Sequence, residues 1–318
     1  MKTILVALCA LVGVASADPA RPTDPSKPGV TERSRLEVKP AQRAFKQLAI
    51  DNPLGDVRVE GYDGTAIMIE THKHAPDDDT LDRLRVSLVP SADGTVRITT
   101  TADGRKGEAT QVSRSQVSID LIIRAPRDAH VDASVTAGKV EIINMDAGGE
   151  LDSGSGSITA KNVSGELLTH SVSGPTSIAQ AFGSVDAATV SSDVDLDTIS
   201  GDKLVASASK GRIAGRRVRS RDVELTTTDG KIMLEAEASL RGHLVVSSLR
   251  GEVDVRIRRH GALIIRARGA KLDLGQQAHA IENRNGWALM AICHATDDTA
   301  AQIDLQSRYG VVRFAIIE

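Results

Sequence analysis

A short pattern recurs along the second half of the chain at a nearly constant spacing. In seven of the eight copies a small residue, usually glycine, stands two positions before an aliphatic one, as in Gly156-Ser157-Ile158, and in the other copy Thr176 takes the aliphatic position. Over seven intervals the pattern advances 132 residues, so its period is about 19 residues. The eight small residues are Gly138, Gly156, Gly174, Ser192, Gly211, Gly230, Gly251 and Ala270.

A second series of aliphatic residues runs in step with the first. Its last five intervals are 18, 19, 19, 21 and 19 residues, the same as those of the small-residue series over that stretch. Because two separate markers drift together, chance similarity does not explain the repeat. The second series comprises Leu151, Leu167, Val185, Leu204, Val223, Leu244 and Leu263.

Each repeat contains short segments in which aliphatic and polar residues alternate, such as Val194-Asp195-Leu196. Alternation with period two points one set of side chains inward and the other to solvent. A single coil of this length cannot bury its inner face, whereas stacked coils form parallel ladders around a continuous core. The repeat therefore predicts an all-β fold, a parallel β-solenoid that we expect to be right-handed. We expect its glycines to form corners with left-handed backbone.

Aromatic residues are too scarce to fill such a core. Val, Ile, Leu and Ala must do so, which suits a narrow interior. The scarcity also argues against stacking surfaces for sugars or single-stranded nucleic acid, and a net charge of −3 offers no overall positive field for nucleic acid. The six rings are Phe45, Phe182, Phe314, Tyr62, Tyr309 and Trp287.

The regions on either side of the repeats, which occupy 129–275, also indicate β-structure. Alternating segments lie at 56–60, 65–71, 83–89, 95–101 and 116–124, separated by Asp-Gly turns. We predict that residues 35–128 are a β-rich cap, because an open solenoid end would template aggregation. Residues 276–318 are predicted to form the C-terminal cap.

The start of the chain has the layout of a secretory signal peptide over residues 1–17. A lysine precedes an apolar run, and Ala15-Ser16-Ala17 supplies a cleavage site. Prolines at every third position between residues 19 and 28 predict an extended linker over 18–34. Cleavage would leave Cys293 as the only thiol and hence no intramolecular disulfide. We expect a mature chain without a transmembrane segment, exported to the periplasm or the cell surface.

Two further segments carry a family resemblance. Residues 52–64 contain Asn52, Gly55-Asp56 and Gly61-Tyr62, and a hydrophobic strand at 119–125 is followed by Pro126 and then by the first repeat. Together they resemble a large bacterial domain family of unknown function whose members are often labelled "putative adhesin". The resemblance covers residues 36–316. It implies a β-solenoid on the cell envelope and supplies no catalytic residues.

Few residues point to a metal or to catalysis. His72 and His74 alternate at the end of a predicted strand, so both imidazoles would share one face and could hold a transition metal, although a polar loop after an edge strand is the simpler interpretation. The pair Cys293-His294 sets a thiol beside an imidazole, but neighbours on a strand point to opposite sides. We predict no catalytic residues and no cofactor.

Charge is distributed unevenly along the repeats. Residues 128–202 carry a net charge of −10, and residues 210–271 a net charge of +8. The basic half could bind an anionic envelope polymer, lipid headgroups or another envelope protein, while cross-rung pairs such as Asp229 with Arg250 would use part of the charge. The candidate residues are Arg216, Arg217, Arg219, Arg258, Arg259, Arg266 and Arg268.

These observations favour a non-enzymatic, exported cell-envelope solenoid that acts in adhesion, scaffolding or sensing. Two alternatives stay open: a carbohydrate-active β-helix enzyme, which would need a pair of carboxylates in a groove, and a metal-binding envelope protein.

Overall fold

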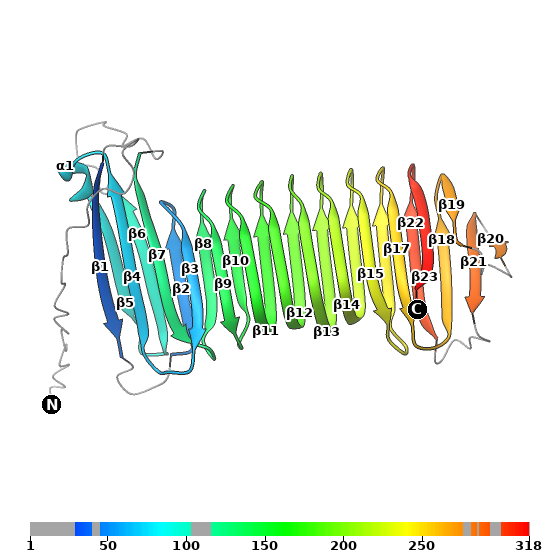
Figure 1. Cartoon of the computed structure of the whole chain (residues 1–318), viewed down its shortest axis with the longest axis horizontal. Coiled ribbons are helices and arrows are strands. Elements are labelled where there is room, and N and C mark those ends of the chain that lie inside the picture. Colours follow the sequence, from blue (N-terminus) through cyan, green and yellow to red (C-terminus); the bar gives the residue numbers. More distant parts are fainter. Residues whose placement is uncertain are drawn as a thin grey trace, which may run out of the picture.

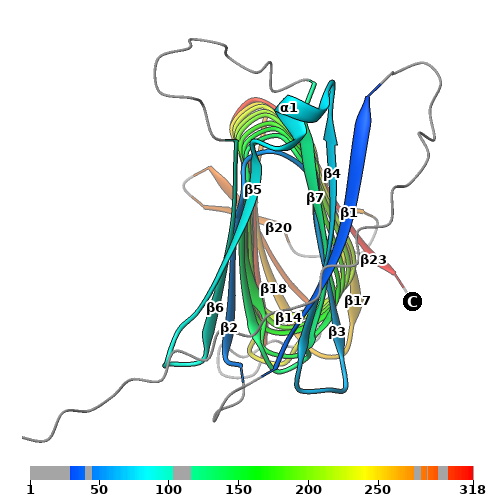
Figure 2. The same cartoon turned by 90° about the vertical axis from the view of Figure 1, so that its left-hand side faces the viewer.

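Two long β-faces lie opposite each other along the length of the molecule (Figures 1 and 2). The computed structural model describes residues 29–39, 45–102, 116–275, 281–284, 286–292 and 300–317.

Face A holds, in spatial order, β1 (Val30–Val38), β4 (Ile67–Ala75), β7 (Ser118–Pro126), β3 (Val57–Tyr62), β9 (Val140–Met145), the first halves of β11 (Ile158–Ser171), β12 (Thr176–Thr189), β13 (Val194–Ala208) and β14 (Ile213–Thr227), then β15 (Ile232–Ala238), β17 (Val253–Arg259), β23 (Val311–Ile317) and β19 (Lys271–Asp273). Face B holds β5 (Leu84–Pro90), β6 (Thr95–Ala102), β2 (Gln47–Asn52), β8 (His130–Val135), β10 (Gly149–Ser153), the second halves of β11 to β14, β16 (His243–Ser248), β22 (Ala301–Ser307), β18 (Leu263–Arg268), β21 (Trp287–Ile292) and β20 (Ile281–Arg284).

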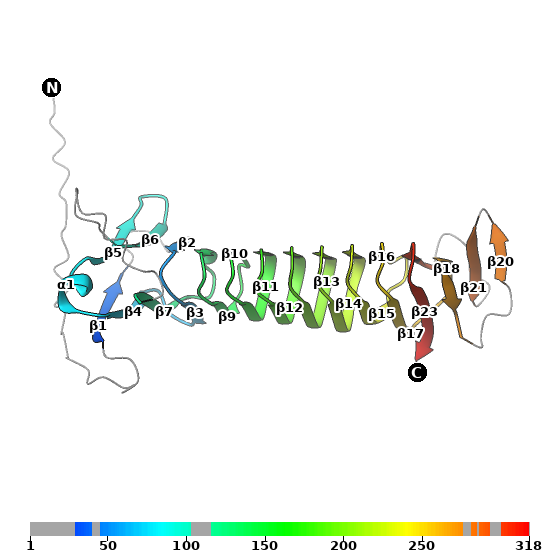
Figure 3. The same ribbon diagram turned by 90° about the horizontal axis from the view of Figure 1, so that it is seen from above.

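The predicted parallel β-solenoid is confirmed. Successive rungs, each one turn of chain across both faces, stack in parallel register along the axis (Figure 3). Buried and outward residues alternate as predicted: Ile178 is buried between Ala160 and Leu196 of the neighbouring rungs, while Ser177 faces out. The only helix in the described residues is the four-residue α1 (Asp78–Leu81), and none there is long and apolar enough to span a membrane.

The repeated glycines form a column at the tight corners, which lie at the top of Figure 1 and which we call the upper edge. None of the column's glycines has a positive φ, so the expectation of left-handed corners is wrong for this column. Each glycine is needed because the carbonyl of the preceding rung comes so close. A Cβ on Gly156 would lie 1.6 Å from the oxygen of Gly138, and one on Gly230 would lie 1.6 Å from that of Gly211.

A buried hydroxyl three residues before the corner completes this arrangement. Ser171 Oγ donates to the Gly174 oxygen at 2.7 Å and accepts the Gly174 N–H at 3.0 Å. Ser248 Oγ likewise accepts the Gly251 N–H at 2.8 Å. The Ser/Thr-x-x-Gly pattern recurs in the sequence and could have been recognised there.

At the opposite edge the chain bends from face A to face B, and we call this the lower edge. Here the left-handed conformation does occur, in Gly148, Gly165, Gly183 and Gly201 and also in five residues other than glycine, whose φ lies between 52° and 59°. Asn162 Nδ2 donates to Asn144 Oδ1 of the preceding rung at 2.7 Å, so side chains link the bends. The five bend residues are Asn144, Asn162, Gln180, Thr198 and Arg217.

The last two strands of the chain lie inside the stack. β22 pairs with β16 on one side and β18 on the other, and β23 lies between β17 and β19. The prediction of a C-terminal cap is therefore wrong for residues 301–317. They form a regular rung because Ser307 and Gly310 repeat the corner pattern, with Gly310 packed against Gly251. The outermost described strands of face B are β21 and β20.

At the N-terminal end, too, the strands do not stack in the order of the sequence. The rung of β2 and β3 lies between β6–β7 and β8–β9, so regular stacking begins near residue 47 and includes part of the predicted cap. The predicted linker is also too long, because β1 begins at Val30 and pairs with β4 over its whole length. Residues 1–28, with the predicted signal peptide, lie outside the described residues.

Candidate anion-binding edge

Three successive bends of the lower edge gather most of the predicted arginines. They are residues 216–222, 237–242 and 258–262, which we call the arginine edge. These bends contain seven arginines and two carboxylates, Asp222 and Glu237. The four preceding bends, 144–148, 162–166, 180–184 and 198–203, contain three carboxylates and one lysine. The charge separation along the sequence is thus concentrated on one edge of the molecule.

Glu237 contacts two arginines and a histidine within this edge. Arg219 Nη2 donates to its Oε1 at 2.8 Å, Arg258 Nη1 lies 3.5 Å from the same oxygen, and His260 Nε2 lies 3.4 Å from Oε2. Partial burial opposes ionisation of Glu237, but the hydrogen bond and charge of Arg219 outweigh it, so the pKa of Glu237 lies below its usual value. The ionised carboxylate ties neighbouring rungs together and leaves the edge positive overall.

The structure brings five of the seven predicted arginines to this edge. Arg217 forms an ion pair with Asp197 of the preceding rung. Arg266 and Arg268 lie elsewhere, on the outer side of β18 in face B, where Arg266 pairs with Asp304. Sequence reasoning missed Arg221 and Arg241, which belong to the edge.

The predicted cross-rung pairing of charges is present, and it lies at the upper edge. Arg250 pairs with Asp229, and Lys231 Nζ lies 3.4 Å from Glu252 Oε2. Lys271, which stands one repeat after Glu252 in the sequence, is displaced by the C-terminal rung, and Arg313 Nη1 lies 3.0 Å from Glu252 Oε2 instead. At the upper edge, acidic and basic side chains therefore neutralise each other's charge, whereas the arginine edge keeps an excess of positive charge.

The two candidate metal ligands share one face of β4 as predicted, but His72 has another partner. His72 Nε2 lies 2.7 Å from Glu70 Oε1, and Glu70 also pairs with Arg33 and Arg35. The described part of the chain contains no group of three or more His, Cys, Asp or Glu residues placed to hold a metal ion. Cys293 and His294 lie outside the described residues.

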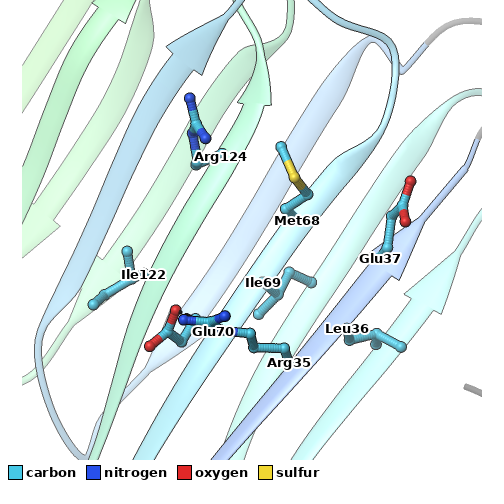
Figure 4. Close-up of a pocket in the computed structure, with 8 residues that line it drawn as sticks. All are labelled: Arg35, Leu36, Glu37, Met68, Ile69, Glu70, Ile122 and Arg124. Carbon is cyan, nitrogen blue, oxygen red and sulfur yellow. Dashed lines mark hydrogen bonds and ion pairs between the residues drawn. The ribbon is translucent and has the colours of Figure 1, made fainter. Parts of the chain in front are cut away.

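A hollow on the outside of face A was not predicted. It has a volume of about 620 Å³ and lies over β1, β4 and β7, as Figure 4 shows. Its charges are largely paired within the protein: Arg35 Nε donates to Glu70 Oε2 at 3.0 Å, and the Arg124 guanidinium lies 5.4 Å from the centre of the Tyr62 ring. Met68 and Ile122 supply apolar surface.

Comparison with known families agrees with the resemblance seen in the sequence. The profile described as Toastrack DUF4097, a domain of unknown function, matches residues 45–263, which is more than half of the chain. The chain belongs to the Toastrack DUF4097 family. The matched segment of this Toastrack chain runs from β2 to the start of β18 and includes the whole arginine edge.

Three solved structures that resemble the Toastrack chain have low sequence identity to it. A "putative adhesin" from Bacteroides fragilis is 13% identical, with 92% of this chain and 99% of that chain covered and a TM-score of 0.41. A "putative lipid binding protein" from Parabacteroides distasonis is 11% identical, with 90% and 97% covered and a TM-score of 0.49. A "putative cell adhesion protein" from Clostridium sporogenes is 9% identical, with 90% and 100% covered and a TM-score of 0.27. At these scores the likeness carries no argument about function. No curated protein matches the sequence.

Proposed function

We propose that this chain is an exported, non-enzymatic module of the cell envelope that binds an anionic component of the envelope through the arginine edge, in adhesion or as a scaffold. The observation that carries the proposal is the excess of five positive charges over three consecutive bends. Like charges aligned on one edge raise the local potential and attract a polyanion, and added salt screens the attraction. The layout of residues 1–17 supports export.

A soluble polyanion tests this binding. The probe is dextran sulfate, with uncharged dextran as its neutral counterpart. The edge variant carries Arg216→Gln, Arg221→Gln, Arg241→Gln and Arg259→Gln. The off-edge variant carries the same chemical change at four exposed arginines elsewhere, Arg97→Gln, Arg124→Gln, Arg268→Gln and Arg308→Gln.

We expect wild type and the off-edge variant to bind dextran sulfate at low salt and release it at high salt, while the edge variant binds weakly. Neither protein should bind dextran. Equal loss of binding in both variants would show that total charge, and not the arginine edge, determines binding, and would overturn the proposal.

A further inference from the structure

One loop of the arginine edge carries an exposed apolar side chain. Residues 239–242 connect β15 to β16 at the lower edge (Figure 1). This repeat is 21 residues long where its neighbours have 19, so the loop is a two-residue insertion. The Gly242 N–H donates to the Ser239 oxygen at 3.0 Å, and Arg241 has a φ of 56°, so the loop is a tight turn.

Leu240, at the tip of this turn, is 66% exposed. A single exposed leucine is common on protein surfaces and needs no explanation by itself. What distinguishes Leu240 is its setting, because the bends on either side contribute Arg219, Arg221, Arg258 and Arg259. An apolar tip surrounded by arginines matches the chemistry of a segment that lies at a membrane surface, with the cations at the headgroups and the apolar group below them.

A hydrated polymer does not account for the leucine. Arginines alone are sufficient to hold a polyanion, and exposing an apolar side chain to water beside it contributes nothing. At a lipid surface both features contribute: each arginine near anionic headgroups strengthens the binding, and the leucine leaves water. The three bends follow one another along a single edge, so they can meet a flat surface together.

We propose that the arginine edge docks on a lipid surface rich in anionic headgroups, with Leu240 entering the interface. This inference rests on the proposed function, since it names the anionic component that the edge binds. It makes Leu240 a binding residue in addition to the arginines.

Vesicle co-sedimentation tests the inference. The probes are vesicles of phosphatidylcholine alone and of phosphatidylcholine with phosphatidylglycerol, and dextran sulfate serves as the soluble polyanion. The variant is Leu240→Ser. Its matched control is Leu249→Ser, because Leu249 is an exposed leucine beside an arginine at the upper edge. Unchanged thermal unfolding would show that both variants are folded.

We expect wild type to bind only the vesicles that contain phosphatidylglycerol. Leu240→Ser should lower that affinity roughly tenfold, because a leucine transferred out of water contributes about 1.5 kcal/mol or more. Its binding to dextran sulfate should be unchanged, and Leu249→Ser should bind both probes as wild type does. A second variant, Leu240→Trp, should show blue-shifted emission with the anionic vesicles relative to wild type.

The outcomes separate the two proposals. If dextran sulfate binds but anionic vesicles do not, or if Leu240→Ser binds vesicles as well as wild type, the lipid inference is overturned while the proposed function stands. If wild type binds neither probe at low salt, the proposed function fails as well.

Discussion

The glycines of the upper edge show how closely successive rungs pack. At Gly230 the neighbouring carbonyl occupies the space that a Cβ would need, and the Thr227 hydroxyl accepts the Gly230 N–H at 3.0 Å. The constraint is the close approach of two backbones, which leaves no room for a Cβ at Gly230. The glycines that repeat in the sequence therefore mark the positions where the backbones of successive rungs are in contact.

The substitution Gly230→Ala should lower the free energy of unfolding by about 3 kcal/mol, as overpacking of a closely packed site does. Chemical denaturation measures this. The control is Gly261→Ala, since its nearest neighbour is the end of the flexible Leu240 side chain, 3.1 Å from the position of a Cβ. Similar stability of the two variants would contradict the close-approach explanation.

Asp120 is a second residue whose environment can be tested. Its Oδ1 accepts the Asp56 N–H at 3.0 Å, and burial raises the pKa of its carboxyl group. A raised pKa means that the folded chain holds a proton more tightly than the unfolded chain, so stability is lost as pH rises through the interval between the two pKa values.

Asp120→Asn keeps the acceptor and removes the charge. We expect the variant to be more stable than wild type at neutral pH, and the difference to disappear below about pH 4, where the unfolded carboxyl is also protonated. Thermal unfolding at a series of pH values measures the difference. A stability difference independent of pH would mean that ionisation of Asp120 is not its cause.

Among the elements, the C-terminal rung departs most from sequence order. The interval from Gly251 to Ala270 is the same as that between directly stacked rungs, and Leu244 to Leu263 is likewise regular. Nothing local therefore shows that β22 and β23 lie between them. In the structure Leu244 faces Ile303, and Ile303 faces Ile265, so the register on face B also shifts.

Engineered disulfides test this order in a Cys293→Ser background. Ser247 lies directly opposite Gln306, so Ser247→Cys with Gln306→Cys should cross-link, because adjacent strands are about 4.8 Å apart. Val245→Cys with Ile264→Cys, which sequence order would make neighbours, should not, because β22 separates their strands. Mass spectrometry under oxidising conditions distinguishes them. Cross-linking of the second pair alone would contradict the observed order.

Some features of the fold could be predicted from the sequence and others could not, because they depend on different properties of the chain. Strand positions, alternation and the solenoid itself depend on local period, so Ile178 and its neighbours were predictable. At both ends of the solenoid a rung stacks between two others out of sequence order. Several rungs have equally regular spacing and could each stack there, so the spacing alone does not predict which one does. Likewise the axial separation of charge was visible in the sequence, but the positions of Arg216 to Arg221 on one edge, away from Arg266, required the bends to be known.

On the scale of the whole molecule, two regular faces fix the edges as straight rows of repeated positions. The upper edge pairs its charges from rung to rung, whereas the lower edge of the C-terminal half retains a positive excess. Because the bends repeat along one edge, a small excess of positive charge in each of three bends adds up to a continuous positively charged row. The same regularity predicts that binding is distributed over several bends, so removal of one arginine should weaken it only partly.

A pull-down from cell-envelope fractions tests the role of the arginine edge most directly. Immobilised residues 18–318, as wild type, edge variant and off-edge variant, are exposed to the fractions at low and at high salt. We predict that wild type and the off-edge variant retain the same anionic component at low salt and lose it at high salt, while the edge variant retains little at either. Retention by the edge variant equal to that of wild type, or no retained component at all, would contradict the account.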